Sequence, residues 1–255
     1  AGVTDRADYL LLDYYRGAAA VGVYGAAYRI IEIVTTLAYS GSLAIFPVLS
    51  RTADKSKADH ARALNKSIKY LSLVGFPLCA GVYLLSEQLM VGLYSSKFAE
   101  SGMCLAILIW SRFMVFTTLP TQQAVQARGG QLGFVPPSIA RAIVNVGMNV
   151  YMIPRYGIWG ASVSMVVTDN VYYALLYLMA FKGEERFNPF VLLGRIVLAT
   201  AAMATVILLV RPLGIWAGIA AGVISYAVAL RVFSVLNAED KKTLRGLLPA
   251  HRKGS

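Results

Sequence analysis

Long apolar segments recur along the whole chain, and this pattern constrains the fold more than any other feature. The segments cover roughly residues 9–22, 23–48, 70–93, 103–122, 135–153, 159–181, 191–210 and 214–235. All but the first are long enough for a helix of about 20 residues, which crosses a bilayer core of about 30 Å. We therefore predict an all-α protein, a polytopic membrane helix bundle with about eight transmembrane helices, the first of them incomplete.

The composition supports a membrane environment. Only 15% of the 255 residues are charged, whereas a soluble domain carries about 25%, so the chain lacks the residues for an ordinary polar surface. Its two cysteines, Cys79 and Cys104, both fall in apolar segments, and we expect them to be small buried side chains. No cofactor motif or metal-ligand spacing is visible, so we expect neither a cofactor nor a metal. No signal peptide is visible, as expected if the chain begins inside a larger protein.

The basic residues indicate how the helices are oriented. Four lie in one set of alternate loops, namely Arg16, Lys97, Arg155 and Arg211. Fourteen lie in the other set, namely Arg51, Lys55, Lys57, Arg62, Lys66, Lys69, Arg128, Lys182, Arg186, Lys241, Lys242, Arg245, Arg252 and Lys253. Basic residues accumulate in short cytoplasmic loops, so we predict that the loop 51–69 and the C-terminus are cytoplasmic. This placement explains the net charge of +11 without nucleic acid, which we do not expect as a partner.

Several polar residues are predicted to lie at bilayer depth, where a charge costs on the order of 3 kcal/mol and usually faces a bundle interior. They are Arg29, Glu32, Arg112, Arg141, Asn145, Asn149 and Asp169. The residues come from four different segments, so a bundle can bring them to one water-accessible cavity. Guanidinium groups match phosphate oxygens well, and the arginines are therefore candidate ligands of an anionic substrate.

We predict that Arg29, Arg112, Arg141, Asn145 and Asn149 bind substrate. Glu32 and Asp169 are predicted to balance the charge of the arginines or to couple transport to an ion. Two alternatives remain open from the residues alone. In the first, Arg29 and Glu32, three residues apart, form a structural pair while Arg112 extends to the interface. In the second, the two asparagines only bond between helices.

Four stretches together resemble a known transporter family. They are VGVYGAAYRI, FPVLSR, AGVYLLSEQLMVGLYSSKF and NVYMIPRYGIWGASVSMVV, which occur in order within about residues 5–180. The chain resembles the polysaccharide exporters, or lipid-linked oligosaccharide flippases, of the multidrug/oligosaccharidyl-lipid/polysaccharide (MOP) exporter superfamily. One departure lies at LYSSKF, where Ser95 and Ser96 stand at a place at which the family commonly has glycine.

The resemblance implies that the chain is the C-terminal lobe of a two-lobed flippase. Residues 1–181 would form the six-helix lobe, with DRADYLLLDYYRG as the end of its first helix, residues 182–236 two additional helices, and 237–255 a cytoplasmic tail. It also implies an alternating-access transporter, not an enzyme, that flips a polyprenyl-pyrophosphate oligosaccharide across the cytoplasmic membrane for cell-surface polysaccharide biosynthesis. The expected partners are this lipid, the bilayer, a missing N-terminal lobe and polysaccharide assembly proteins.

Two other functions compete with this prediction. A multidrug or organic-cation antiporter of the same superfamily is the nearer one, although its cavity should favour carboxylates and aromatics over arginine. A membrane-embedded polymerase or ligase is less favoured, because such chemistry usually needs a polar loop that supplies an acid or a base. Here the predicted external loops are a few residues long, and both histidines, His60 and His251, lie on the predicted cytoplasmic side.

Overall fold

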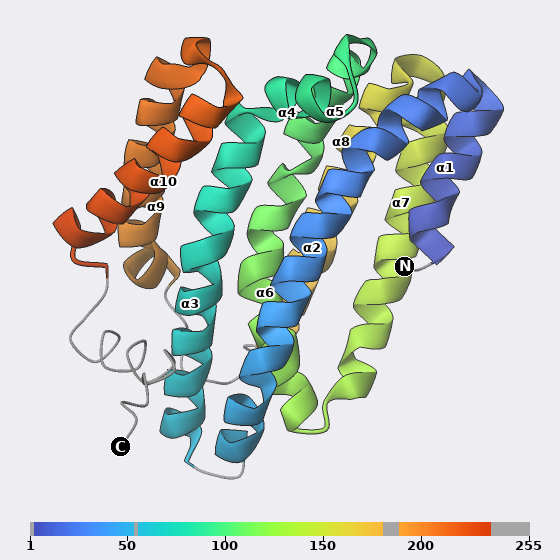
Figure 1. Ribbon diagram of the computed structural model, residues 1–255. Helices are drawn as coiled ribbons and strands as arrows, with labels where there is room; N and C mark the ends of the chain where they lie inside the picture. The colour runs from blue at the N-terminus through green and yellow to red at the C-terminus, as the bar shows by residue number, and fades with distance from the viewer. Residues whose placement is uncertain (1–2, 54–55, 181–188, 236–255) are drawn as a thin grey trace, which may run out of the picture.

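The protein is helical throughout the part that the computed structural model describes, residues 3–53, 56–180 and 189–235, and no strand occurs there (Figure 1). The helices are α1 (Val3–Arg16), α2 (Ala18–Ala53), α3 (Lys57–Leu84), α4 (Ser86–Leu93), α5 (Ala99–Leu108), α6 (Trp110–Ala127), α7 (Val135–Tyr156), α8 (Ile158–Ala180), α9 (Pro189–Val210) and α10 (Ile215–Val232). Three short 3₁₀ turns are η1 (Ser96–Phe98), η2 (Gln131–Phe134) and η3 (Arg211–Leu213). The predicted all-α class is confirmed.

The long helices run side by side as a bundle with two ends (Figure 1). In the described chain, residues of α2, α5, α6 and α8 form most of one large apolar core, to which α1, α3, α4 and α7 also contribute. The helices α9 and α10 pack on each other and on α3, and a second apolar core joins them to the end of α2. The division predicted at residue 181 falls outside the described residues, as do the tail 237–255 and most of the loop 182–190.

The predicted boundary between the first two helices is wrong. We expected one segment over 9–22 and the next from residue 23, but α1 ends at Arg16 and α2 already begins at Ala18. Gly17 lies between them with a φ of 79°, and its N–H donates to the carbonyl of Asp13. This left-handed conformation favours glycine and ends the first helix, so the apolar residues after it start the second.

Two further segments differ from the predicted spans. The span expected over 70–93 begins earlier, at Lys57, and ends at Leu84, with α4 following as a separate short helix. The loop 51–69 therefore runs into the next span as predicted. The span expected over 103–122 consists of α5 and α6, which meet at an angle of 41°. Between α4 and α5, Ser95 adopts a φ of 143° and a ψ of 175°, a conformation almost restricted to glycine.

Close packing of the helices depends on two glycines. A Cβ added to Gly160 at the start of α8 would lie 2.7 Å from the carbonyl carbon of Met152 in α7. A Cβ on Gly75 of α3 would lie under 3.0 Å from ring atoms of Phe116, which is buried in α6. Small residues at helix crossings let backbones approach in membranes, where packing replaces the hydrophobic effect as the main source of association.

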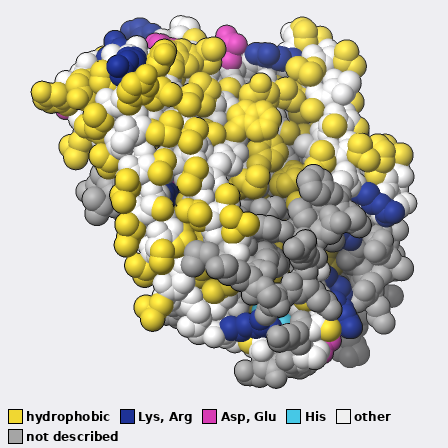
Figure 2. All heavy atoms as spheres, turned by 180° about the vertical axis from the view of Figure 1, so that it is seen from behind, with side chains coloured by type: hydrophobic (Ala, Val, Ile, Leu, Met, Phe, Trp, Pro, Cys, Tyr) yellow, Lys and Arg dark blue, Asp and Glu magenta, His cyan; other side chains and the backbone are white. Residues whose placement is uncertain are grey.

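The outer surface of the bundle is apolar. Large side chains such as Leu209, Trp216 and Val232 are at least 70% exposed, and Figure 2 shows hydrophobic side chains over much of one face. Within the described residues, four helices are long and apolar enough to cross a membrane, or up to five if α5 and α6 count as one bent span. Cys79 and Cys104 are free and buried, as predicted. This surface suits lipid as its solvent.

Candidate functional site

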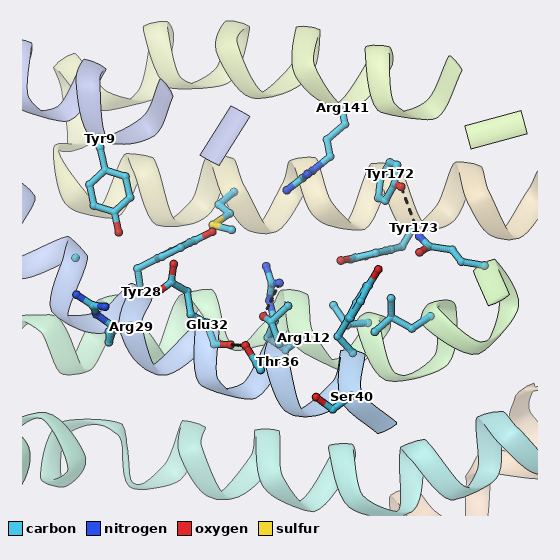
Figure 3. Close-up of a pocket in the computed structure, with 17 residues that line it drawn as sticks. Tyr9, Tyr28, Arg29, Glu32, Thr36, Ser40, Arg112, Arg141, Tyr172 and Tyr173 are labelled. Carbon is cyan, nitrogen blue, oxygen red and sulfur yellow. Dashed lines mark hydrogen bonds between the residues drawn. The ribbon is translucent and has the colours of Figure 1, made fainter. Parts of the chain in front are cut away.

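A cavity of about 910 Å³ opens among α1, α2, α6, α7 and α8 (Figure 3). It is at the upper end of the 300–1,000 Å³ that small-molecule sites usually occupy. Three arginines line it, each from a different helix: Arg29 from α2, Arg112 from α6 and Arg141 from α7. The predicted convergence of these side chains on one hollow is confirmed. With Glu32 and the buried Asp169 they leave an excess of one positive charge at the site.

The helix α2 presents its polar face to this cavity. Ile31, Val34 and Ala38 are buried in the apolar core, whereas the opposite face is exposed. That exposed face carries Arg29, Glu32, Thr36 and Ser40, which all line the cavity. The spacing of three and four residues keeps these groups on one side of the helix. The two charges of α2 therefore border the cavity.

Arg29 and Glu32 are not a structural pair in this conformation. Both side chains are exposed, and within the described part of the chain no ion pair of 4.0 Å or less joins them. The alternative in which these two charges only satisfy each other is therefore not what the structure has. Both are available to a molecule that enters the cavity.

The centre of the cavity wall is an ion network around one carboxylate. Asp169 of α8 is 1% exposed and accepts from two guanidinium groups, those of Arg112 and Arg141. The Arg141 contacts to Oδ1 measure 3.1 Å from Nε and 2.8 Å from the terminal nitrogen. Figure 3 shows the two arginines approaching each other from opposite walls. A buried carboxylate is tolerated when paired and hydrogen-bonded in this way.

The two arginines of the network differ in what they expose. Arg112 is 5% exposed and donates to Ser111 Oγ, Thr35 Oγ1 and Asp169 from its three different nitrogens. Arg141 keeps about a quarter of its side chain exposed, and its guanidinium lies 5.6 Å from the centre of the Tyr172 ring. Each nitrogen of Arg112 thus donates to a protein group. Arg141 borders the open space directly.

The predicted asparagines lie elsewhere. Asn145 and Asn149 of α7 are buried and do not line the cavity. Asn149 donates from Nδ2 to the carboxylate of Asp8 in α1 and to Oδ1 of Asn145, the latter at 3.2 Å. The hydroxyl of Tyr24 contacts the same Asp8 carboxylate at 3.5 Å. In this conformation Asn149 bonds between helices, as in the alternative that the residues left open, and Asn145 accepts from Asn149 within α7.

Several cavity residues lie outside the set predicted to bind substrate or to balance charge. Five tyrosines line it, and Gln122 and Thr35 add polar groups; the tyrosines are Tyr9, Tyr28, Tyr39, Tyr172 and Tyr173. Tyr172 and Tyr173 follow Asp169 by three and four residues, so helical spacing alone places them on its face. That signal was available in the sequence. Nothing comparable pointed to Tyr9, because it depends on how α1 packs against α2.

Comparison with known proteins agrees with this architecture. A family model described as "Polysaccharide biosynthesis protein" matches residues 2–102. The "Probable flippase AglR" of Haloferax volcanii is 22% identical over 215 residues, which cover 81% of this chain and 45% of that protein. The chain is thus similar to a polysaccharide-biosynthesis family over residues 2–102 and to a named flippase over most of its length. The resemblance stated from the sequence is therefore confirmed.

Other matches agree with this relationship. The "Probable low-salt glycan biosynthesis flippase Agl15" of the same organism is 22% identical over 165 residues, 64% of this chain and 35% of that flippase. A solved structure, "Lipid II flippase MurJ, inward closed conformation", superposes with a TM-score of 0.80 at 16% sequence identity. The match covers 91% of this chain and 50% of the MurJ chain. This similarity in structure shows that the two chains share a fold. The chain thus spans about half the length, or less, of the flippases that it matches.

Proposed function

We propose that this chain forms one lobe of an alternating-access transporter that flips a polyprenyl-pyrophosphate oligosaccharide across the cytoplasmic membrane. The observation that carries the proposal is the arginine-lined cavity within a bundle whose outer surface is apolar. A polar headgroup can enter such a cavity while its lipid tail stays in the bilayer. The matched relatives are named flippases, and transporters of this kind carry out no covalent chemistry.

In this proposal the cavity residues have different roles. Arg141 reaches the pyrophosphate and Arg29 the sugar part of the headgroup beside it, because both border the open space. Arg112 holds Asp169, and through Asp169 it positions Arg141. Glu32 balances the charge of Arg29 or senses a coupling ion. Asn145 and Asn149 would reach substrate only in another conformation, since here they bond to each other and to α1.

The remaining assignments of the lobe are part of the same proposal. Residues 1–181 act as the C-terminal lobe and 182–236 as two additional helices, and a second lobe faces the open side of α2. The loop 51–69 and the C-terminus face the cytoplasm, which follows from the distribution of basic residues. Rocking of the two lobes would expose the cavity to each side of the membrane in turn. Polysaccharide assembly proteins would supply and receive the substrate.

The multidrug antiporter is the weaker candidate because of the charge of the cavity. Three arginines against two carboxylates favour an anion, whereas an organic cation would need an excess of negative charge. A competition experiment separates the two functions. A lipid pyrophosphate should displace a labelled lipid-linked oligosaccharide from the purified protein, and tetraphenylphosphonium should not.

A transport assay with cavity variants tests the proposal directly. The full-length gene product is reconstituted in liposomes with a fluorescent polyprenyl-pyrophosphate oligosaccharide, and the label exposed on each leaflet is measured. Arg29→Gln should slow flipping at least about tenfold, because an exposed cavity charge is lost without loss of an ion pair. The matched control is Arg155→Gln, since Arg155 lies outside this cavity, above the Tyr151 ring. Equal flipping rates for the two variants would contradict the proposal.

A further inference from the structure

The cavity has an aromatic corner at the end where α2 begins. The rings of Tyr9 and Tyr28 lie 5.9 Å apart and meet at 87°, and both line the cavity (Figure 3). Gly25, one helical turn before Tyr28, also lines it and adds no side chain between them. A Cβ there would be 3.5 Å from the Tyr9 ring, which is an ordinary contact distance. The Tyr9 ring therefore lies over Gly25, and the two rings form one wall of the cavity.

The corner is held in place from behind. Tyr24 is 0% exposed, lies 6.0 Å from Tyr28 in a stacked arrangement and 5.5 Å from Tyr9 at 72°. Its hydroxyl contacts the carboxylate of the buried Asp8. One face of Tyr28 is therefore directed toward Tyr24, and the ring is oriented before any ligand arrives. An aromatic surface that is already fixed loses little entropy when a ligand binds.

Charged groups lie directly beside this corner. Arg29 follows Tyr28 in the chain, and Glu32 comes one helical turn later on the exposed face of α2. Arg29 offers a guanidinium donor and Glu32 a carboxylate acceptor close to two aromatic rings. A pyranose ring has the matching chemistry, with an apolar face of C–H groups and a rim of hydroxyls that donate and accept. The negative face of an aromatic ring attracts the positive C–H groups. The hydroxyls can accept from the guanidinium and donate to the carboxylate.

The lining of the cavity argues against the lipid tail as the occupant of the corner. Of its 17 residues only Val115, Leu119 and Met165 are aliphatic or thioether side chains. An isoprenoid chain would gain from an apolar wall, which the outer surface of the bundle offers instead. A sugar is the part of the substrate that fits both the rings and the charges.

We propose that Tyr9 and Tyr28 form a sugar-stacking subsite, in which Arg29 and Glu32 bond the hydroxyls of one pyranose while the phosphate lies nearer Arg141. This inference rests on the proposed function and names the part of the substrate that each region of the cavity holds. The subsite selects for a glycan on the lipid pyrophosphate. It does so through ring faces, which tolerate more than one sugar.

Binding of a bare lipid probe and of two sugar-bearing probes to the full-length gene product tests the subsite. The bare probe is farnesyl pyrophosphate, and the other two carry one N-acetylglucosamine or one glucose on the same lipid. The affinity of each is measured by calorimetry in detergent. Wild-type protein should bind the sugar-bearing probes more tightly than the bare lipid. Tyr9→Leu and Tyr28→Leu should each reduce this advantage about 2- to 12-fold, as expected for loss of one aromatic contact. Binding of the bare lipid should not change.

Two controls keep a folding defect separate from loss of the subsite. Tyr9→Phe and Tyr28→Phe keep the rings and should retain the sugar advantage, with the melting temperature measured for every variant. Tyr14→Leu changes an exposed tyrosine of α1 that does not line the cavity, and it should bind all three probes as the wild type does. If wild type binds the bare lipid but shows no sugar advantage, the subsite is wrong and the proposed function stands. If wild type binds none of the probes, the proposed function fails and the subsite with it.

Discussion

Asp169→Asn is the most informative single change, because Asp169 is the carboxylate on which two arginines converge. The substitution keeps the size of the side chain and removes its charge, so the guanidinium of Arg112, 5% exposed, loses its ionic partner. Removing one member of a buried pair costs about 3–5 kcal/mol. Arg141 adds little to this cost, since its side chain is 26% exposed and a partly solvated ion pair contributes up to about 1 kcal/mol. We expect a destabilisation near 3 kcal/mol, because asparagine still accepts one hydrogen bond.

The free energy of unfolding in detergent micelles measures this effect in a double-mutant cycle. Arg112→Met should also destabilise the protein, while Asp169→Asn combined with Arg112→Met should cost at least about 1 kcal/mol less than the sum of the two. The matched control is Arg29→Met, which removes an exposed cavity charge without an ion pair and should change stability by less than about 0.5 kcal/mol. Additive effects, or single variants that unfold like the wild type, would refute the network as a source of stability.

Three further predictions concern the scaffold. Ser95→Gly should raise the melting temperature, because relief of about 1–3 kcal/mol of backbone strain exceeds the entropy cost of glycine, about 0.5–1 kcal/mol; a lower melting temperature would count against the strain. Gly160→Ala should cost about 1–3 kcal/mol by overpacking against α7, measured by chemical unfolding, and a neutral result would mean that the helices separate freely. Glu87→Gln should change stability by less than about 1 kcal/mol, since its pair with Arg211 at 3.3 Å is exposed.

The sequence predicted the helical class, the burial of the cysteines and the convergence of the arginines. These predictions depend on composition, periodicity and the cost of charge in lipid, which act along the chain. The helix boundaries were less accurate. The break between α5 and α6 lies at Ile109 within an apolar run, where hydropathy gives no signal, and the start of α2 directly after Gly17 depends on the left-handed conformation of that one glycine.

The partners of the polar residues were the part that the sequence did not determine. Arg112, Arg141 and Asn149 were all predicted to lie at bilayer depth, and all three received the same role. In the structure each nitrogen of Arg112 donates to a protein group and Asn149 bonds to Asp8, whereas Arg141 keeps about a quarter of its side chain exposed in the cavity. Depth along a helix is fixed by its rise per residue, but the direction of a side chain depends on how neighbouring helices pack.

Site-specific photocrosslinking tests most directly whether the cavity receives the lipid-linked substrate. A photoreactive phenylalanine derivative at Thr36, which is exposed in the cavity, is compared with one at Ile143, which is 68% exposed but does not line the cavity. With a radiolabelled polyprenyl-pyrophosphate oligosaccharide in native membranes, we expect a crosslink from position 36 that unlabelled substrate suppresses, and none of that kind from position 143. Crosslinking at position 143 alone, or at neither position in a transport-active protein, would contradict the central claim.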